Sequence, residues 1–150
     1  MKGFTTIELL WIFGVLAIIF GFTTVSLGGI QQRSTMNTII DKLRTDIKQQ
    51  QLLSMIGDTQ GLSQSAPYGI YFDLNRYVLF RGASYNPSDP SNIPVELSDN
   101  FEFTPAGRTL LFSVLSGQIP TSTSQAILDT TNNNTRTIYL NLLGVVIGVE

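Results

Sequence analysis

The segment from Leu9 to Ile30 carries no formal charge, and most of its side chains are apolar. Residues 9–20 read Leu-Leu-Trp-Ile-Phe-Gly-Val-Leu-Ala-Ile-Ile-Phe. A helix of about 20 apolar residues can cross a bilayer, because its backbone groups bond to one another there. The sequence therefore predicts a membrane-spanning helix near the N-terminus. Lys2, which precedes the segment, favours a cytoplasmic N-terminus.

A second helical pattern follows the apolar segment without a strong break. Its apolar residues recur at helical spacing and form one stripe. No proline occurs before Pro67, so one helix is expected from about Phe4 to Ile56, with a weak point at Gly28 and Gly29. The residues of the stripe are Met36, Ile40, Leu43, Ile47, Leu52, Met55 and Ile56.

The second half of the chain has the pattern of β-structure. Tyr68–Phe72 and Tyr77–Phe80 are short runs of aromatic and aliphatic residues on either side of Asp73–Arg76, which predicts a hairpin. We expect one sheet of roughly six strands, with the helix stripe as its cover. The predicted fold class is α+β: a long N-terminal membrane-spanning helix whose C-terminal half packs on a small antiparallel β-sheet head. Further strands are expected over residues 101–103, 109–115, 136–142 and 145–149.

Composition excludes several classes of active site. The chain of 150 residues is one domain in size and has no Cys and no His, which rules out disulfide scaffolds, Ser-His-Asp triads and His/Cys zinc sites. A net charge of −2 is untypical of a nucleic-acid binder. We expect no enzyme, catalytic residue, cofactor or metal site. The acids considered for a catalytic carboxylate pair are Asp73, Asp99, Glu102 and Asp129. The side chains considered as calcium ligands are Asp129, Asn132, Asn133 and Asn134. With one carboxylate among these four, a solvated turn is preferred to a calcium site.

The first ten residues contain a specific motif, Lys-Gly-Phe-Thr-Thr-Ile-Glu-Leu-Leu over residues 2–10. It resembles the class III signal of type IV pilins and type II secretion pseudopilins. The resemblance implies that a prepilin peptidase cuts after Gly3 and methylates the new N-terminus at Phe4. It also implies that Glu8 sets subunit register by meeting the Phe4 amine of a neighbouring subunit. A charge in an apolar span is costly without such a partner.

A weaker likeness covers most of the chain. The helix, Tyr68–Phe72, Phe103–Gly107 and the closing segments Arg136–Leu140 and Gly144–Val146 are similar to the H-type minor pseudopilins and FimT-type minor pilins. The resemblance implies four parts: a leader at 1–3, a membrane and assembly half of the helix at 4–30, an amphipathic half at 31–56 and a β-rich head at 57–150.

The function implied is that of a structural subunit of a type II secretion pseudopilus or type IV pilus. The bulky Trp11 and Phe13 favour a minor subunit over the bulk pilin. Such filaments serve protein secretion, adhesion, motility or DNA uptake. The implied partners are other pilins or pseudopilins, the prepilin peptidase, an inner-membrane assembly platform and, before assembly, membrane lipid. The implied location is the bacterial inner membrane, single-pass, with the head periplasmic or extracellular, and then the filament.

Four alternatives remain open. The chain could be a singly anchored membrane protein that is never cut at Gly3 and keeps Met1. The N-terminus could be an ordinary signal peptide cut near Ser26-Leu27-Gly28, although Glu8 argues against it. The chain could be a major pilin. The head could instead bind DNA or another ligand in a competence system, but nucleic acid is not favoured because the head has few cations: Arg76, Arg81, Arg108 and Arg136.

Overall fold

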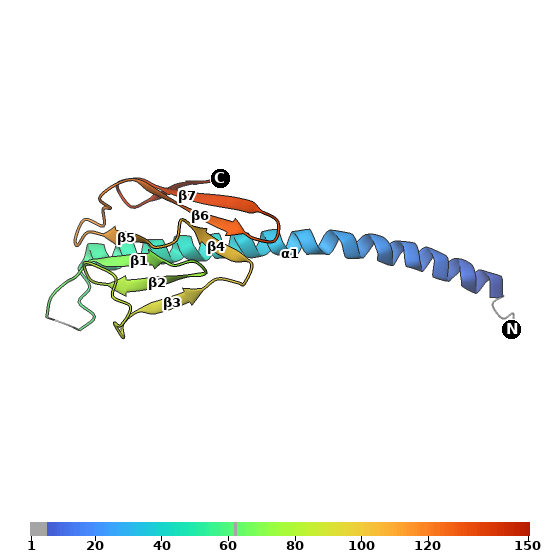
Figure 1. Cartoon of the computed structure of the whole chain (residues 1–150), viewed down its shortest axis with the longest axis horizontal. Helices are drawn as coiled ribbons and strands as arrows, with labels where there is room; N and C mark the ends of the chain where they lie inside the picture. Colours follow the sequence, from blue (N-terminus) through green and yellow to red (C-terminus); the bar gives the residue numbers. More distant parts are fainter. Residues whose placement is uncertain (1–5, 62) are drawn as a thin grey trace. The chain divides into compact units, whose positions relative to one another are not determined.

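The part of the chain that the structure describes folds into one helix and eight strands, which form two antiparallel sheets (Figure 1). The computed structural model describes residues 6–61 and 63–150, and the side chains of residues 6–18, 35–61 and 63–150. The helix α1 spans Thr6–Ile56. The chain divides into two compact units, Met1–Thr38 and Ile39–Glu150, and the second unit contains both sheets.

Sheet A contains four strands in the order β3-β2-β1-β5. Its central hairpin confirms the sequence prediction, because Phe72 pairs with Tyr77 across the turn and Tyr68 pairs with Arg81 at the other end. Asp73 holds that turn by accepting a hydrogen bond from the Leu74 amide at 2.9 Å. The strands are β1 (Tyr68–Phe72), β2 (Arg76–Arg81), β3 (Ile93–Glu96) and β5 (Arg108–Phe112).

Sheet B also contains four strands, in the order β4-β6-β7-β8. Phe103 of β4 contacts Phe72 and Tyr77 of sheet A edge to face, with ring centroids 5.1 and 6.0 Å apart. These aromatic contacts join the two sheets in one core. The strands are β4 (Phe101–Thr104), β6 (Thr123–Asp129), β7 (Asn134–Leu140) and β8 (Val146–Val149).

The predicted fold class is wrong in two respects. Among the residues that the structure describes, no helix has the length and hydropathy of a membrane span. The predicted membrane-spanning helix and the predicted single-pass location in the inner membrane are therefore contradicted for that part of the chain. The head is also not one sheet of roughly six strands, because its eight strands divide equally between two sheets.

The two strands that the sequence did not predict have unusual patterns. β3 contains Pro94 and lies at an edge of sheet A, where a missing amide costs no bond within the sheet. From Ser124 to Asp129, β6 alternates between partly exposed and buried positions, but Gln125 and Asp129 occupy two of the buried positions. The polar residues obscured the apolar alternation by which a strand is recognised.

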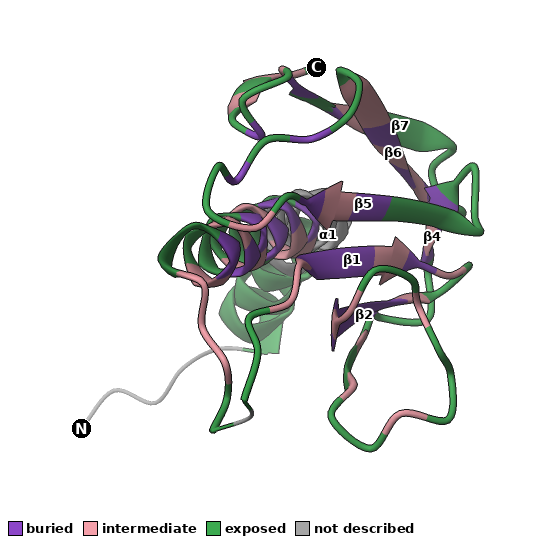
Figure 2. Ribbon diagram, turned by 90° about the vertical axis from the view of Figure 1, so that its left-hand side faces the viewer, coloured by how far each residue is buried: buried purple, intermediate pink, exposed green. Residues whose placement is uncertain are grey.

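The C-terminal part of α1 buries one face against sheet A. Figure 2 shows its buried residues on the side that faces β1 and β5. Ile40, Leu43 and Ile47 confirm the predicted stripe. Beyond Ile47 the prediction is wrong, since the 3.6-residue period continues the buried face through polar side chains. Gln50 and Ser54 are buried there, and Leu52, Met55 and Ile56 are exposed.

Candidate functional site

The predicted site residues are Gly3, Phe4 and Glu8, close to the N-terminus of the chain. Gly3 and Phe4 lie outside the described residues. Glu8 is in the first turn of α1 and is exposed. An acidic side chain in the first turn of a helix is stabilised by the helix dipole, so Glu8 also has a local structural role.

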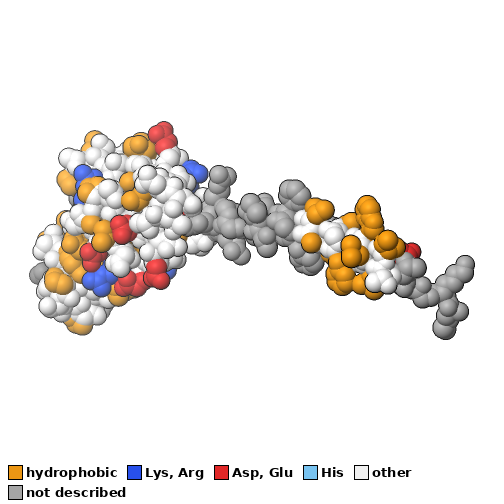
Figure 3. Space-filling model, turned by 45° about the vertical axis from the view of Figure 1, so that its right-hand side comes forward, with side chains coloured by type: hydrophobic (Ala, Val, Ile, Leu, Met, Phe, Trp, Pro, Cys, Tyr) orange, Lys and Arg blue, Asp and Glu red, His pale blue; other side chains and the backbone are white. Residues whose placement is uncertain are grey.

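Large apolar side chains surround Glu8 on the same helix, and we call this surface the apolar sleeve. Their exposed fractions range from 40% to 73%. Because five consecutive residues are included, the sleeve covers every face of the helix and not one stripe. Orange side chains cover this part of the chain in Figure 3. The sleeve consists of Ile7, Leu9, Leu10, Trp11, Ile12, Phe13, Val15, Leu16 and Ile18.

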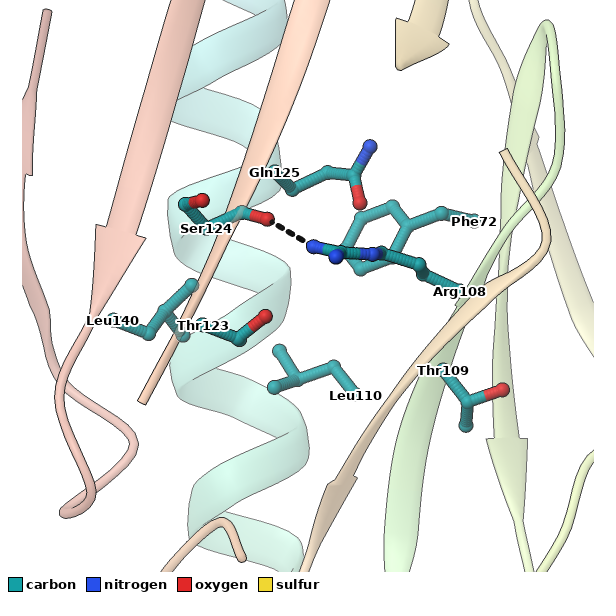
Figure 4. Close-up of a pocket in the computed structure, with 8 residues that line it drawn as sticks. All are labelled: Phe72, Arg108, Thr109, Leu110, Thr123, Ser124, Gln125 and Leu140. Atoms are coloured by element: carbon teal, nitrogen blue, oxygen red, sulfur yellow. Dashed lines mark hydrogen bonds between the residues drawn. The ribbon is translucent and has the colours of Figure 1, made fainter. Parts of the chain in front are cut away.

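A second candidate site is a cavity of about 130 Å³ in the head, between β5 and β6 (Figure 4). We call it the β5–β6 cavity. Phe72, Leu110 and Leu140 form its apolar wall, and the other lining residues carry polar side chains. These are Arg108 and Thr109 of β5, with Thr123, Ser124 and Gln125 of β6.

Two polar side chains define the chemistry of this cavity. Arg108 donates from Nη1 to the Ser124 carbonyl oxygen at 2.9 Å and so joins the two sheets. Gln125 is buried and donates from Nε2 to the Pro105 carbonyl oxygen at 3.1 Å. Sequence reasoning considered Arg108 only as a head cation and did not select Gln125. The alternation of β6 was the signal that could have placed Gln125 inside.

The head arginines do not offer a simple cationic surface. Arg76 forms ion pairs with Asp73 at 3.1 Å and Glu96 at 3.9 Å, and its hydrogen bond to Asp73 is the main cause of its raised pKa. Arg81 donates to the Gln64 carbonyl oxygen at 2.5 Å. With Arg108 bonded to Ser124, three of the four arginines considered for DNA contact protein oxygen atoms.

The carboxylates considered for catalysis or calcium have local partners. Asp73 bonds to Arg76 across the β1–β2 turn. Residues 130–133 of the β6–β7 turn are exposed, as predicted for a solvated turn, but Asp129 itself is buried. It accepts hydrogen bonds from the Thr131 amide at 3.0 Å and from Asn132 Nδ2 at 3.1 Å. Asp129 therefore holds the β6–β7 turn closed. The described residues contain no group of three or more acids that could hold a metal ion.

Comparisons of the chain with protein-family models, with curated proteins and with solved structures gave no match.

Proposed function

We propose that the chain is a structural subunit of a helical filament, of the prepilin type that its N-terminal motif resembles. The observation that supports this most is the apolar sleeve, which exposes large side chains on every face of one helix segment. Apolar surfaces of this extent mark sites of association. The proposed partners are the same segments of other subunits.

The energetics favour packing of one sleeve against another. Fully burying a large aliphatic or aromatic side chain contributes about 1.5–3 kcal/mol. The sleeve has nine such side chains that are at least 40% exposed, so association could remove much apolar area from water. A helix that is apolar all round is normally buried on all sides. A bundle of parallel helices would bury it in this way.

Glu8 would set the register of that bundle. In the proposed maturation, a prepilin peptidase cuts after Gly3 and leaves a methylated amine on Phe4. Such an amine is a cation, and a carboxylate of a neighbouring helix attracts it more strongly in a bundle that excludes water. An unpaired Glu8 would be costly in the same surroundings, so subunits shifted along the axis would be disfavoured.

Filament incorporation of Glu8→Val tests the proposal. We expect a normal cellular amount of the variant and a roughly tenfold or larger depletion from the sheared filament fraction, because leaving one partner of a buried charge pair costs several kcal/mol. Immunoblots of cells and filaments from the native host measure both amounts. Asp99→Ala, at an exposed acid of the head, is the control and should assemble normally. Normal assembly of Glu8→Val would contradict the register role.

The intact mass of the mature protein tests the processing step separately. We expect loss of Met1, Lys2 and Gly3 and gain of one methyl group. Gly3→Val should keep the full-length mass. Filaments built from chains that keep the first three residues would disprove the proposed maturation.

A further inference from the structure

The β5–β6 cavity has the size and the polarity of a small-ligand site. Its volume is about 130 Å³, and a protein cavity of about 150 Å³ can hold a benzene molecule. It therefore admits a group of five or six heavy atoms. Arg108 and Thr109 are exposed, so the cavity opens to solvent on the β5 side.

Gln125 supplies a buried acceptor in this cavity. Gln125 is only 3% exposed, and the hydrogen bond that its Nε2 donates to the Pro105 carbonyl oxygen fixes the orientation of the side-chain amide. Oε1 is buried and has no hydrogen-bond partner among the described residues. In Figure 4 this oxygen is on the side of Arg108 and Phe72. A buried acceptor without a donor is destabilising, which favours a ligand that brings an N–H group.

Arg108 supplies a positive charge, which favours an anionic group on the ligand. Its guanidinium group uses Nη1 for the Ser124 carbonyl, and among the described residues it forms no ion pair. The remaining N–H groups of an arginine match the two oxygens of a carboxylate. Phe72, Leu110 and Leu140 leave room only for a compact carbon skeleton beside these polar groups.

We propose that the β5–β6 cavity binds a compact carboxylate with a neighbouring N–H donor, the chemistry of a small α-amino acid residue. The carboxylate accepts hydrogen bonds from Arg108, and the ligand N–H donates to Gln125 Oε1. A free amino acid and the C-terminal residue of a peptide share this chemistry. The site lies within the head and does not depend on the proposed filament assembly.

Titration of the full-length chain in mild detergent with four probes tests the proposal by calorimetry. Glycine represents the free amino acid and N-acetylglycine represents a peptide C-terminus. Acetate lacks the N–H donor and N-acetylglycinamide lacks the carboxylate. We expect glycine or N-acetylglycine to bind about tenfold or more tightly than acetate and N-acetylglycinamide, because each omitted group removes a hydrogen bond to a buried or charged partner. Whichever of the first two binds more tightly identifies the source.

Two variants assign the binding to the named side chains. Arg108→Gln should weaken the better probe about tenfold or more, because the carboxylate loses its charged partner. Gln125→Met removes the acceptor and should abolish the preference for the better probe over acetate. Arg136→Gln removes an exposed cation of β7 that does not line the cavity, and should bind as the wild type does.

Circular dichroism checks that Gln125→Met still folds. If this variant does not fold, the binding of the probes to Arg108→Gln tests the proposal instead. The proposal is overturned if neither glycine nor N-acetylglycine binds with a Kd below about 10 mM, because the cavity would then hold only water. It is also overturned if N-acetylglycinamide or acetate binds as tightly as the better probe, or if Arg136→Gln loses binding as much as Arg108→Gln does.

Discussion

Ser54 joins three parts of the head through one short side chain. Its Oγ donates to the Phe112 carbonyl oxygen of β5 at 2.7 Å and accepts from the Tyr68 amide of β1 at 3.2 Å. Its own carbonyl oxygen accepts from the Leu115 amide at 2.9 Å. Because Ser54 is fully buried, these bonds satisfy groups that water cannot reach. The last turns of α1 therefore need a polar residue on their buried face.

Tyr77 is a second buried polar contact between the helix and sheet A. Its hydroxyl group donates to Asp46 of α1. Burial raises the pKa of Tyr77, and the hydrogen bond to Asp46 and the negative charge of Asp46 raise it further. Burial, with a smaller contribution from Asp58, also raises the pKa of Tyr68. Both side chains keep their protons in the folded state at pH values at which an exposed tyrosine would ionise.

These shifts predict a loss of stability at alkaline pH. The contribution of Tyr77 is complete below the ordinary tyrosine pKa of about 10 and falls as the pH rises above it, since only the unfolded chain then releases the proton. We expect the free energy of unfolding to fall by up to about 1 kcal/mol per pH unit above pH 10, after allowance for solvent screening. Denaturant unfolding between pH 8 and about pH 11.5 measures it.

Tyr77→Phe should flatten this pH dependence, and Tyr68 should maintain part of it. Tyr139→Phe removes a hydroxyl group from an exposed position of β7 and serves as the control. An unchanged alkaline slope in Tyr77→Phe would show that the raised pKa of Tyr77 does not contribute to folding.

At the scale of elements, β1 is held between β2 and β5 by a close approach at Gly69. A Cβ atom at this position would lie 2.6 Å from Phe80 Cζ and 2.7 Å from the Leu110 carbonyl oxygen. The first contact involves a buried ring of β2 and the second a backbone atom of β5, so neither can move without disturbing the sheet. A glycine is required here by space and not by turn geometry.

Gly69→Ala should lower the free energy of unfolding by about 2–3 kcal/mol, because overpacking forces the strands apart. Gly148→Ala is the matched control in β8, where the nearest atom to the new Cβ is Tyr139 Cδ2 at 4.0 Å. It should change stability by less than about 1 kcal/mol. Denaturant unfolding of the two variants compares them directly. Equal stability of the two would show that sheet A relaxes around the extra methyl group.

At the scale of the whole molecule, the unit Ile39–Glu150 has a core of its own. The buried side chains of α1 from Ile40 onward pack in the same unit as both sheets. The apolar sleeve belongs to the other unit, Met1–Thr38. Folding of the head and association through the sleeve are therefore expected to be separable.

A chain shortened to begin at Ile39 should fold and stay monomeric. We expect one cooperative unfolding transition, because the core residues from Ile40 onward are retained. The full-length chain without detergent should form larger species through the sleeve. Circular dichroism and light scattering measure folding and mass. A monomeric full-length chain would contradict the proposed role of the sleeve, and an unfolded fragment would contradict the independence of the head.

The sequence by itself determined the features that depend on near neighbours in the chain. The β1–β2 hairpin follows from two apolar runs around Asp73–Arg76, and the stripe from Ile40 to Ile47 follows from helical spacing. The apolar segment that begins at Leu9 was evident as well, although its interpretation as a membrane span is contradicted in the described residues.

Only the tertiary structure decided which strands pair and which polar side chains lie inside. The packing of the two sheets into one core depends on contacts such as those of Phe103 with Phe72 and Tyr77, which join residues far apart in the chain. Ser54 and Gln125 are buried because backbone groups of distant segments give them hydrogen-bond partners. No local period can indicate such partners, since they exist only once the sheets have formed. The sequence could not predict the β5–β6 cavity for the same reason.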